Sequence, residues 1–520
     1  MDLKSYWRTT LVVFALAGIV LFWLCADRLS LNADEGIYLD GALRVMHGQA
    51  PYRDFFVHTG PGSYWLYAGV FRLFGATLSH ARAPVICEIA AIAAAVFFLT
   101  ANLTSYAFGL GVAFVVFALE TRDLGMIALN HRWDSSSMAF LAVAPAYAAI
   151  CGGSARLSFA AGVLAAAAAW CTPTLGIVAL AIALWMLADR EIRKLLPAFI
   201  FGMTAVSLLC IGILAMEHAL VPLVQHFLWT GANYSAANHV PYGWAGTGYL
   251  EIGTGLGTVG WIFYSLLLAV IVAPAVLPIL TWLGWAVYFA IRRTPMQQEK
   301  PTWFLIVCSV ALVASTYPRW DIGHLLYVAP ISYVLAATLL YRAASSKVTA
   351  AVAFAAMVVA IFVWAPLMLK AGDSVRLETP AGAVRVEADD RKLLEMILTR
   401  VRPGESLFVF PYFATIYFLT RGVNPTHFSY LQPGLMTDAD EAEALKELTA
   451  DPPEWVLYND VPPEVYLKHW PSSDPKRLRM HSIEQFLGEN YRTVEKQRHR
   501  LGEFSLLRRG VPQTGHGTAP

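Results

Sequence analysis

Long apolar segments alternate with short polar segments over the first 370 residues of the chain. Most of them approach the roughly 20 residues that an α-helix needs to cross the hydrocarbon core of a bilayer. The pattern predicts an α-helical polytopic membrane protein with about eleven transmembrane helices, in a range of about 10–13. The segments run approximately over residues 9–27, 83–101, 104–120, 135–151, 158–172, 174–188, 196–216, 257–291, 301–316, 323–341 and 348–369.

The segment 257–291 is too long for one ordinary span, and it contains Pro274 and Pro278. Proline kinks or ends a helix, and a long apolar stretch can tilt or extend along the membrane interface. A kinked span with an interfacial extension and a hidden extra crossing both fit this segment.

After residue 370 the pattern becomes that of a water-soluble fold. Short apolar runs predict buried strands, and apolar residues at helical spacing predict two helices. The expected strands lie at 406–410 and 455–458, and the expected helices lie at 389–400 and 439–449.

Composition supports this division of the chain. Of the 520 residues, 57% are hydrophobic and 14% are charged, whereas a soluble domain has about 25% charged residues. The part after residue 370 holds 21 of the 37 acidic residues. The net charge of the whole chain is +1, which gives no electrostatic case for nucleic acid as a partner. We expect a transmembrane domain over 1–370, a small α/β domain over 371–510 and a disordered tail over 511–520.

Lys and Arg residues indicate the orientation in the membrane. Cytoplasmic loops carry an excess of these residues, and the loop 217–256 has none. With a cytoplasmic N-terminus and an odd number of spans, the loop 28–82 and the α/β domain lie outside a bacterial cytoplasmic (inner) membrane. The first apolar run lacks an Ala-x-Ala cleavage pattern, so we expect it to stay as a span. The residues on the expected cytoplasmic side are Lys4, Arg8, Arg156, Arg190, Arg193, Lys194, Arg292, Arg293, Lys300, Arg342 and Lys347.

The first outer loop, 28–82, is rich in aromatic residues among Gly, Pro and His. This composition predicts one or two amphipathic helices that lie in the membrane interface and form the floor of a cavity. The loop begins near two adjacent carboxylates, Asp34 and Glu35. A carboxylate at the membrane edge costs on the order of a few kcal/mol unless a partner or water meets it, which makes the pair a candidate functional site. The alternative for Asp34 is an N-cap of the next helix.

The residues 34–62 carry a resemblance to a known family. Asp34-Glu35, then a tyrosine, Tyr38, and later Pro-Tyr-Arg-Asp-Phe-Phe and Thr-Gly-Pro-Gly, resemble the polytopic glycosyltransferases of the protein O-mannosyltransferase and lipid A aminoarabinose transferase superfamily. The resemblance implies a GT-C fold and transfer of a sugar, with inversion, from a polyprenyl-phosphate carrier at the outer face of the membrane. The acceptor would be an envelope lipid, polysaccharide or protein.

In that chemistry a carboxylate takes the proton of the attacking hydroxyl, and a general base contributes about 10²–10⁴-fold. We expect Asp34 to be this base and Glu35 to position the acceptor or hold the local charge. Asp134, in the run Asn130-His131-Arg132-Trp133-Asp134, is a further acidic candidate. It would contact the sugar, orient Arg132, or cap the span that begins at Ser135. The residues assigned to acceptor or sugar binding are Tyr38, Arg53, His58, His131 and Arg132.

Three residues are candidates for the phosphate of the carrier. A guanidinium neutralises a departing phosphate well, so Arg319 is the main candidate, with His324 as a second donor. The alternative for Arg319 is an ion pair with Asp321 that fastens the loop. Arg82 is the third candidate, and its alternative is an interfacial anchor. Many members of the resembled family carry a basic residue near the stretch 170–174, which here reads Trp-Cys-Thr-Pro-Thr.

No cofactor is expected. No HExxH or comparable ligand spacing appears, and the six cysteines form neither a CxxC pair nor a disulfide framework. Oligosaccharyltransferases of this fold use a divalent cation with an acidic pair, so a metal stays open. Two other functions also stay open: a transporter or flippase, for which the sequence lacks the usual inverted repeat, and an inactive scaffold in envelope assembly.

Overall fold

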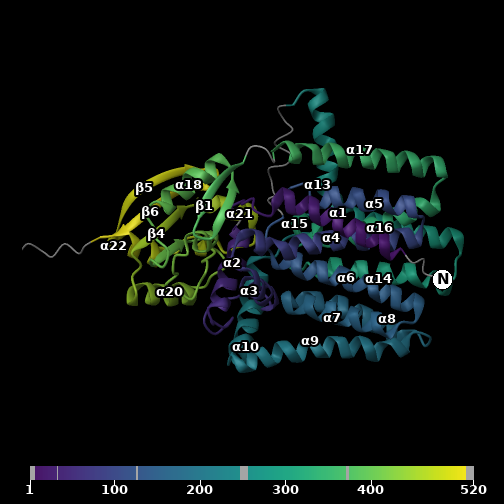
Figure 1. Ribbon diagram of the computed structural model, residues 1–520, viewed down its shortest axis with the longest axis horizontal. Helices are drawn as coiled ribbons and strands as arrows, with labels where there is room; N and C mark the ends of the chain where they lie inside the picture. Colours follow the sequence, from purple (N-terminus) through teal and green to yellow (C-terminus); the bar gives the residue numbers. More distant parts are fainter. Residues whose placement is uncertain (1–5, 32, 124–126, 246–255, 371–373, 511–520) are drawn as a thin grey trace, which may run out of the picture.

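The computed structural model describes residues 6–510 apart from 32, 124–126, 246–255 and 371–373. A bundle of long helices and an α/β domain lie end to end along the longest axis of the molecule (Figure 1). The predicted tail 511–520 lies outside the described residues. The N-terminal end of the described chain lies at the far end of the bundle from the α/β domain (Figure 1).

Ten of the eleven apolar segments predicted to span the membrane each form one helix of the bundle, and the segment 323–341 is divided between the short helix α15 (Ile322–Leu326) and α16 (Pro330–Ala343). Six of the helices, α1, α4, α6, α9, α13 and α17, are long and apolar enough to cross a bilayer by themselves. The number of crossings stays a prediction. The bounds are α1 (Trp7–Cys25), α4 (Leu78–Leu103), α5 (Tyr106–Glu120), α6 (His131–Gly152), α7 (Ala155–Cys171), α8 (Gly176–Ala188), α9 (Leu196–Met216), α13 (Thr258–Arg292), α14 (Lys300–Ala314), α16 (Pro330–Ala343) and α17 (Ser346–Lys370).

The long segment around Pro274 and Pro278 forms one helix, α13, of 35 residues. The chain does not turn back inside it, so the hidden extra crossing is wrong.

Small residues allow the closest helix packing in the bundle. A Cβ on Gly162 of α7 would lie 2.0 Å from the carbonyl oxygen of Phe199, and a Cβ on Gly202 of α9 would lie 2.3 Å from that of Phe159. Only glycine permits this approach of two backbones, which is common between helices in membranes.

Ion pairs join several loops of the expected cytoplasmic side at one end of the bundle. Lys300 Nζ lies 2.8 Å from Asp189 Oδ2, and Arg342 lies 2.6 Å from Glu299. The loops around residues 189–195, 292–300 and 342–346 therefore meet, as their shared basic character predicts. Their orientation in a membrane stays a prediction.

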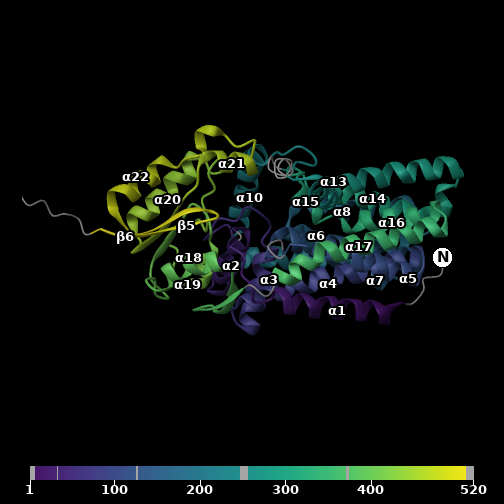
Figure 2. The ribbon, with the colours of Figure 1, turned by 90° about the horizontal axis from the view of Figure 1, so that it is seen from above.

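Short helices fill the junction between the other end of the bundle and the α/β domain (Figure 2). The predicted amphipathic helices of the first outer loop are two of them. Their aromatic side chains are mostly buried in protein, with Tyr38, Tyr64 and Tyr67 at most 1% exposed. The α/β domain covers α2, so this helix does not lie in the lipid interface. The helix α3 leaves Leu73 and Phe74 77% and 65% exposed, and its place at the interface stays a prediction. The bounds are α2 (Ala33–Met46), α3 (Gly62–Phe74), α10 (Leu220–Trp229), the π-helix η4 (Thr230–Tyr234) and α15 (Ile322–Leu326).

The α/β domain contains a four-stranded sheet in the order β3-β4-β6-β5. The strands β3 and β4 are parallel, and the other neighbours are antiparallel. Both predicted strands and both predicted helices are confirmed. The bounds are β3 (Leu407–Phe410), β4 (Trp455–Asp460), β5 (Tyr491–His499), β6 (Gly502–Arg509), α18 (Ala388–Leu398), α19 (Thr415–Thr420), α20 (Asp438–Ala450), α21 (Pro463–His469) and α22 (His481–Asn490).

A separate hairpin, β1 (Val375–Thr379) and β2 (Gly382–Val386), joins the domain to the end of α1. The backbone N–H of Arg385 donates to the carbonyl of Asp27 over 2.7 Å, and that of Leu29 donates to the carbonyl of Arg385 over 2.8 Å. An ion pair of 2.6 Å between Arg385 and Asp27 adds to the contact. The segment that leads into α2 is therefore fixed on the domain.

The helix α2 is fastened to the domain along its length. A Cβ on Gly36 would lie 2.0 Å from the backbone nitrogen of Thr415 in α19. Farther along α2, Ser429 Oγ donates to Asp40 Oδ2 over 2.5 Å, and the Arg44 guanidinium donates to the carbonyl of Thr426 over 3.0 Å. The position of α2 thus depends on both parts of the molecule.

Candidate active site

Asp34 lies in the first turn of α2, where the helix meets the start of α6. The side-chain amide of Asn130 donates to Asp34 Oδ2 over 3.1 Å. The same amide accepts through Oδ1 from the backbone N–H of Arg132 over 2.8 Å, so Asn130 also caps α6. One side chain therefore connects the carboxylate to the start of a long helix, and helix N-termini favour negative charge.

The environment of Asp34 makes it a stronger base than an ordinary carboxylate. Burial raises its pKa above the usual value, while the charge of Arg319 and the hydrogen bond from Asn130 hold the pKa down. A raised pKa strengthens proton acceptance, and the neighbouring cation and donor keep the charged form available.

Glu35 and Arg82 form an ion pair that faces away from this chemistry. Arg82 donates to both carboxylate oxygens of Glu35, each over 2.8 Å. It also donates to the carbonyls of Cys25 and Arg28, and both charged side chains are at most 1% exposed. Four of the five N–H donors of Arg82 are used in these contacts, which favours the alternative prediction of an anchor over a role in phosphate binding. The pair of Glu35 and Arg82 connects the end of α1 to α2 and α4, and the role of Glu35 beside the acceptor stays a prediction.

Arg319 pairs with Asp321, as its alternative prediction states. Arg319 Nε donates to Asp321 Oδ2 over 3.0 Å, and another of its nitrogens donates to the carbonyl of His469 over 3.0 Å. The pairing with the loop does not remove Arg319 from the site, because its charge lowers the pKa of Asp34. Arg319 thus connects the α/β domain to the candidate base.

Asp321 holds the second predicted phosphate ligand, His324. The Asp321 side chain accepts from the backbone N–H of His324 over 3.0 Å, and His324 Nδ1 lies 3.0 Å from the same oxygen. Burial alone would raise the pKa of Asp321, but His324 and Arg319 lower it well below its usual range. The carboxylate is therefore charged and keeps the ring of His324 in place.

Asp134 lies one turn farther along α6 than Asn130 and is fully buried. Its Oδ1 accepts a hydrogen bond of 2.6 Å from the hydroxyl of Tyr67. Because Asn130 is the cap of α6, the N-cap alternative for Asp134 is wrong. Asp134 does not orient Arg132 either, since the contacts of the two side chains are separate. The structure places Asp134 in the buried interior of the molecule, and its expected contact with the sugar stays a prediction.

Arg132 is buried, with 3% of its surface exposed. It donates weakly, over 3.5 Å, to the carbonyl of Ser315. Its Nε has no hydrogen-bond partner within the described part of the chain. Arg132 therefore differs from Arg82 and Arg319, whose donors meet carboxylates.

Aromatic and imidazole rings form the wall of the site beside Arg132. The ring of His58 stacks on Tyr234 with 6.0 Å between centroids and lies edge-on to His131 at 5.7 Å. His131 Nδ1 lies 2.7 Å from the hydroxyl oxygen of Thr172 and the ring lies 5.9 Å from that of Tyr38. The structure thus brings together three of the predicted acceptor or sugar residues.

His58 is neutral in this wall. Burial, then the neighbouring His226 and Arg132, lowers the pKa of His58 to about 3. The ring therefore offers one donor and one acceptor and no charge at physiological pH.

Arg53 lies apart from this cluster. Its guanidinium pairs with Asp54 at 2.6 Å and donates to the carbonyl of Glu217 over 2.5 Å. More than a third of the side chain is exposed, and these contacts fasten the outer loop to the end of α9. The expected role of Arg53 in acceptor or sugar binding is not supported.

The α/β domain contributes residues that sequence reasoning missed. Tyr430 Oη lies 2.8 Å from His58 Nδ1 in a hydrogen bond, and the guanidinium of Arg319 lies 5.7 Å from the ring centre of Trp470. The only available signal was the presence of aromatic residues in a polar part of the chain. That signal does not tell which loop folds back onto the membrane domain.

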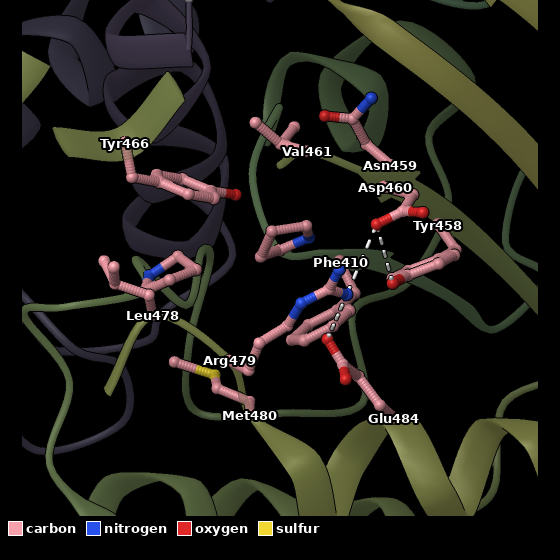
Figure 3. Close-up of a pocket in the computed structure, with 12 residues that line it drawn as sticks. Phe410, Tyr458, Asn459, Asp460, Val461, Tyr466, Leu478, Arg479, Met480 and Glu484 are labelled. Atoms are coloured by element: carbon pink, nitrogen blue, oxygen red, sulfur yellow. Dashed lines mark hydrogen bonds and ion pairs between the residues drawn. The ribbon is translucent and has the colours of Figure 1, made fainter. Parts of the chain in front are cut away.

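A small hollow lies inside the α/β domain, and Asp34 is not among the residues that line it. Arg479 crosses it and pairs with Asp460 at 3.3 Å and Glu484 at 3.1 Å (Figure 3). Its volume of about 10 Å³ is no larger than the space for one water molecule. This hollow is too small for a substrate.

Among the described residues, no group of three or more His, Cys, Asp or Glu side chains is placed to hold a metal ion, and metal dependence stays open.

The fold is that of known sugar transferases. No family model matches the sequence, and no curated protein matches it in sequence. The structure of ArnT from Cupriavidus metallidurans in the apo state matches with 14% identity and a TM-score of 0.53, over 97% of this chain and 98% of that chain. The structure of ArnT bound to undecaprenyl phosphate matches with 12% identity and a TM-score of 0.53, over 96% of this chain and 97% of that chain. The archaeal oligosaccharyltransferase AglB from Archaeoglobus fulgidus, in complex with an inhibitory peptide and a dolichol-phosphate, also matches (13%, 99% and 76%, 0.51).

These likenesses confirm the predicted fold class. The chain has the fold of the GT-C glycosyltransferases, with a helical membrane domain and a small C-terminal α/β domain. Together with the long apolar helices, they make it a multi-pass membrane protein. At 12–14% identity the likeness concerns the fold.

Proposed function

We propose that the protein is a membrane glycosyltransferase that moves a sugar from a polyprenyl-phosphate carrier to an envelope acceptor. One observation carries the proposal: a carboxylate of raised pKa, Asp34, is held by Asn130 within the field of Arg319, where the bundle meets the α/β domain. Two of the structures that share the fold contain undecaprenyl phosphate or dolichol phosphate, which supports the choice of carrier.

The reaction is one displacement at the anomeric carbon of the sugar. The acceptor hydroxyl oxygen attacks this carbon, Asp34 takes the hydroxyl proton, and the bond from the carbon to the carrier phosphate breaks. The phosphate oxygen leaves with the electron pair, so the products are the glycosylated acceptor and the polyprenyl phosphate. A single displacement inverts the configuration of the anomeric carbon. Asn130 holds the accepting oxygen of Asp34, and such positioning is a large part of general-base catalysis.

The site is proposed to face the extracytoplasmic side of a bacterial inner membrane. The loops rich in Lys and Arg lie together at the end of the bundle opposite Asp34, as the ion pairs of Lys300 and Arg342 show. Positive loops mark the cytoplasmic side. The donor would then be presented from the outer leaflet, and the α/β domain would cover it.

A donor comparison tests the proposal. Inverted and right-side-out membrane vesicles that contain the protein are supplied with labelled undecaprenyl-phosphate sugars or with labelled nucleotide sugars. We expect transfer from at least one lipid-linked sugar in right-side-out vesicles and none from nucleotide sugars. Transfer from nucleotide sugars alone, or from no lipid-linked sugar of a hexose, pentose and amino-sugar panel, would reject the proposal.

A further inference from the structure

Arg132 is a buried cation that forms no ion pair with any of the described residues. The side chain is 3% exposed, and it forms no ion pair within the described part of the chain. Its one hydrogen bond, to the carbonyl of Ser315, is 3.5 Å long, and its Nε has no partner. A guanidinium stays charged in proteins, and burying such a charge without compensation costs several kcal/mol. A fold keeps such a cation when an anion occupies the place beside it in the working state.

Three other arginines around the site have a carboxylate partner. Arg82 binds Glu35 through two nitrogens, Arg44 pairs with Asp40 at 3.1 Å, and Arg319 pairs with Asp321 at 3.0 Å. The pair of Arg82 and Glu35 joins α4 to α2, and Arg44 and Arg319 also donate to carbonyls of the α/β domain. Arg132 fastens nothing of comparable strength, so a structural role does not account for its charge.

The surroundings of Arg132 are suited to an oxyanion. Its electrostatic neighbours include the phenols of Tyr234, Tyr38 and Tyr327, and Asp321 acts on it as well. Asp321 is already bound by Arg319 and by His324. The hydroxyl of Tyr38 is buried beside the side chains of Thr59 and Tyr64. Phenol and guanidinium are both donors to phosphate oxygens.

The N-terminus of α6 adds to the positive electrostatic potential around Arg132. Arg132 is the second residue of the 22-residue helix α6, and the N-terminus of a helix carries a partial positive charge. Tyr234 lies near both Arg132 and Arg319, whose charges both lower the pKa that burial raises for its phenol. Tyr234 is therefore within the field of two guanidiniums, of which that of Arg319 forms an ion pair.

We propose that Arg132, with the hydroxyl of Tyr38, binds the phosphate of the polyprenyl carrier. This assignment rests on the proposed function and refines it, since the sequence placed Arg132 with the acceptor or sugar residues and gave the phosphate to Arg319. When the bond from the anomeric carbon to the phosphate breaks, the phosphate gains negative charge, and Arg132 neutralises it. Arg319 instead acts on Asp34 and holds the loop of Asp321.

Ligand binding tests the assignment without an activity assay. The full chain is purified in detergent, and its Tm is measured with undecaprenyl phosphate, with undecaprenol, or with inorganic phosphate. The variants are Arg132→Met, Arg132→Lys and, as a matched control, Arg53→Met, which removes an exposed arginine that has an ion pair. The Kd for undecaprenyl phosphate follows from the concentration dependence of the shift.

We expect undecaprenyl phosphate to raise the Tm of the wild type and of Arg53→Met. In Arg132→Met the affinity falls by about tenfold or more, since a charge-assisted contact is lost. In Arg132→Lys, which keeps the charge but cannot bind phosphate in a bidentate way, the affinity falls less. Ligand-free Arg132→Met has a Tm equal to or above that of the wild type, because the uncompensated charge is gone.

Other outcomes separate the claims. If the wild type does not bind undecaprenyl phosphate, the proposed function fails with this inference. If the wild type and Arg132→Met bind it equally, this inference alone fails. A lower Tm for ligand-free Arg132→Met shows a structural cation and rejects it too. If inorganic phosphate reproduces the full shift in an Arg132-dependent way, the site takes free phosphate, and the assignment to the lipid is wrong. Should Arg132→Met not fold, unchanged affinity in Arg132→Lys and Tyr38→Phe rejects it.

Discussion

The side-chain amide of Asn130 donates to the carboxylate of Asp34 over 3.1 Å and so connects the first turn of α2 to the cap of α6. The two residues are far apart in the sequence, and each belongs to a different helix of the site. This bond fixes the orientation of the candidate base relative to Arg132, which lies two residues after Asn130. Catalysis at Asp34 is therefore expected to depend on the position of α6.

Substitution of Asn130 by alanine removes this positioning. We expect kcat to fall by about tenfold or more, with a smaller change in the KM for the donor, because the base is present but no longer held. The pKa of Asp34 also rises, since the hydrogen bond lowers it. Steady-state transfer kinetics measure both effects. Asn490→Ala, at the exposed end of α22, is the control, and an equal loss in the two variants would argue against positioning.

As the pH is lowered, we expect the activity to be lost at a higher pH than the one at which an ordinary aspartate is protonated. Asp34 works as a base when it is deprotonated, and burial raises its pKa, so protonation inactivates the site at a higher pH than for a free carboxyl, about 3.9. Arg319 lowers this pKa, so Arg319→Gln moves the acid limb of kcat/KM to still higher pH. Arg376→Gln, which changes an exposed arginine, leaves the limb in place. A shift to lower pH in Arg319→Gln would contradict this arrangement.

Glu35 is expected to support the fold and not the chemistry. Glu35→Gln leaves Arg82 buried without its counter-charge, which costs roughly 3–5 kcal/mol in comparable cases. The variant should show a much lower Tm and yield. The pair Glu35→Leu with Arg82→Met removes both charges and recovers part of the stability. A Glu35→Gln protein of normal Tm that has lost transfer would instead make Glu35 catalytic.

His58 is expected to contribute through shape and hydrogen bonding. Its pKa of about 3 keeps it neutral, so it adds no limb near pH 6.5 to the rate profile. His58→Gln should raise the KM and leave the shape of the pH profile unchanged. Tyr430→Phe, which removes the hydroxyl bonded to His58, should act in the same direction. Loss of a limb near neutral pH in His58→Gln would show that the ring titrates during catalysis.

The contact of α2 with α19 is expected to be needed for activity. Gly36→Ala places a Cβ 2.0 Å from the backbone nitrogen of Thr415, so one of the two elements must move. Gly69→Ala, in the neighbouring helix α3, meets nothing within 4 Å and is the matched control. Transfer should fall strongly in Gly36→Ala and stay within about twofold of the wild type in the control. Equal activity of both variants would mean that the domain is not required to hold α2.

The sequence predicts the helices of the bundle well, because long apolar segments have few alternatives to helices in a membrane. It also identifies Asp34, since an acidic pair at the edge of an apolar span has a high cost. The strand β6 is missing from the prediction although its residues 504–507 are buried. The strand β5 escapes prediction because it is largely exposed and carries alternating charged residues. Its pattern gives no buried apolar run.

The roles of the arginines depend on contacts that no local pattern shows. Arg82 and Arg132 are both arginines near the start of a long helix. Arg82 is neutralised by Glu35, which lies 47 residues earlier in the chain. No carboxylate lies within ion-pair distance of Arg132 among the described residues, although Asp134 is only two positions away. Sequence spacing alone cannot show which arginine stays unpaired, because the helix turns the side chain of Asp134 toward Tyr67.

The most direct test of the account is the rate of sugar transfer from an undecaprenyl-phosphate sugar by Asp34→Asn, compared with Asp451→Asn at the exposed end of α20. The account predicts that kcat/KM of Asp34→Asn falls by about 10²-fold or more while the protein still binds undecaprenyl phosphate, because the amide keeps the shape and cannot take the proton. The control keeps the wild-type rate. Transfer by Asp34→Asn at the wild-type rate would contradict the account.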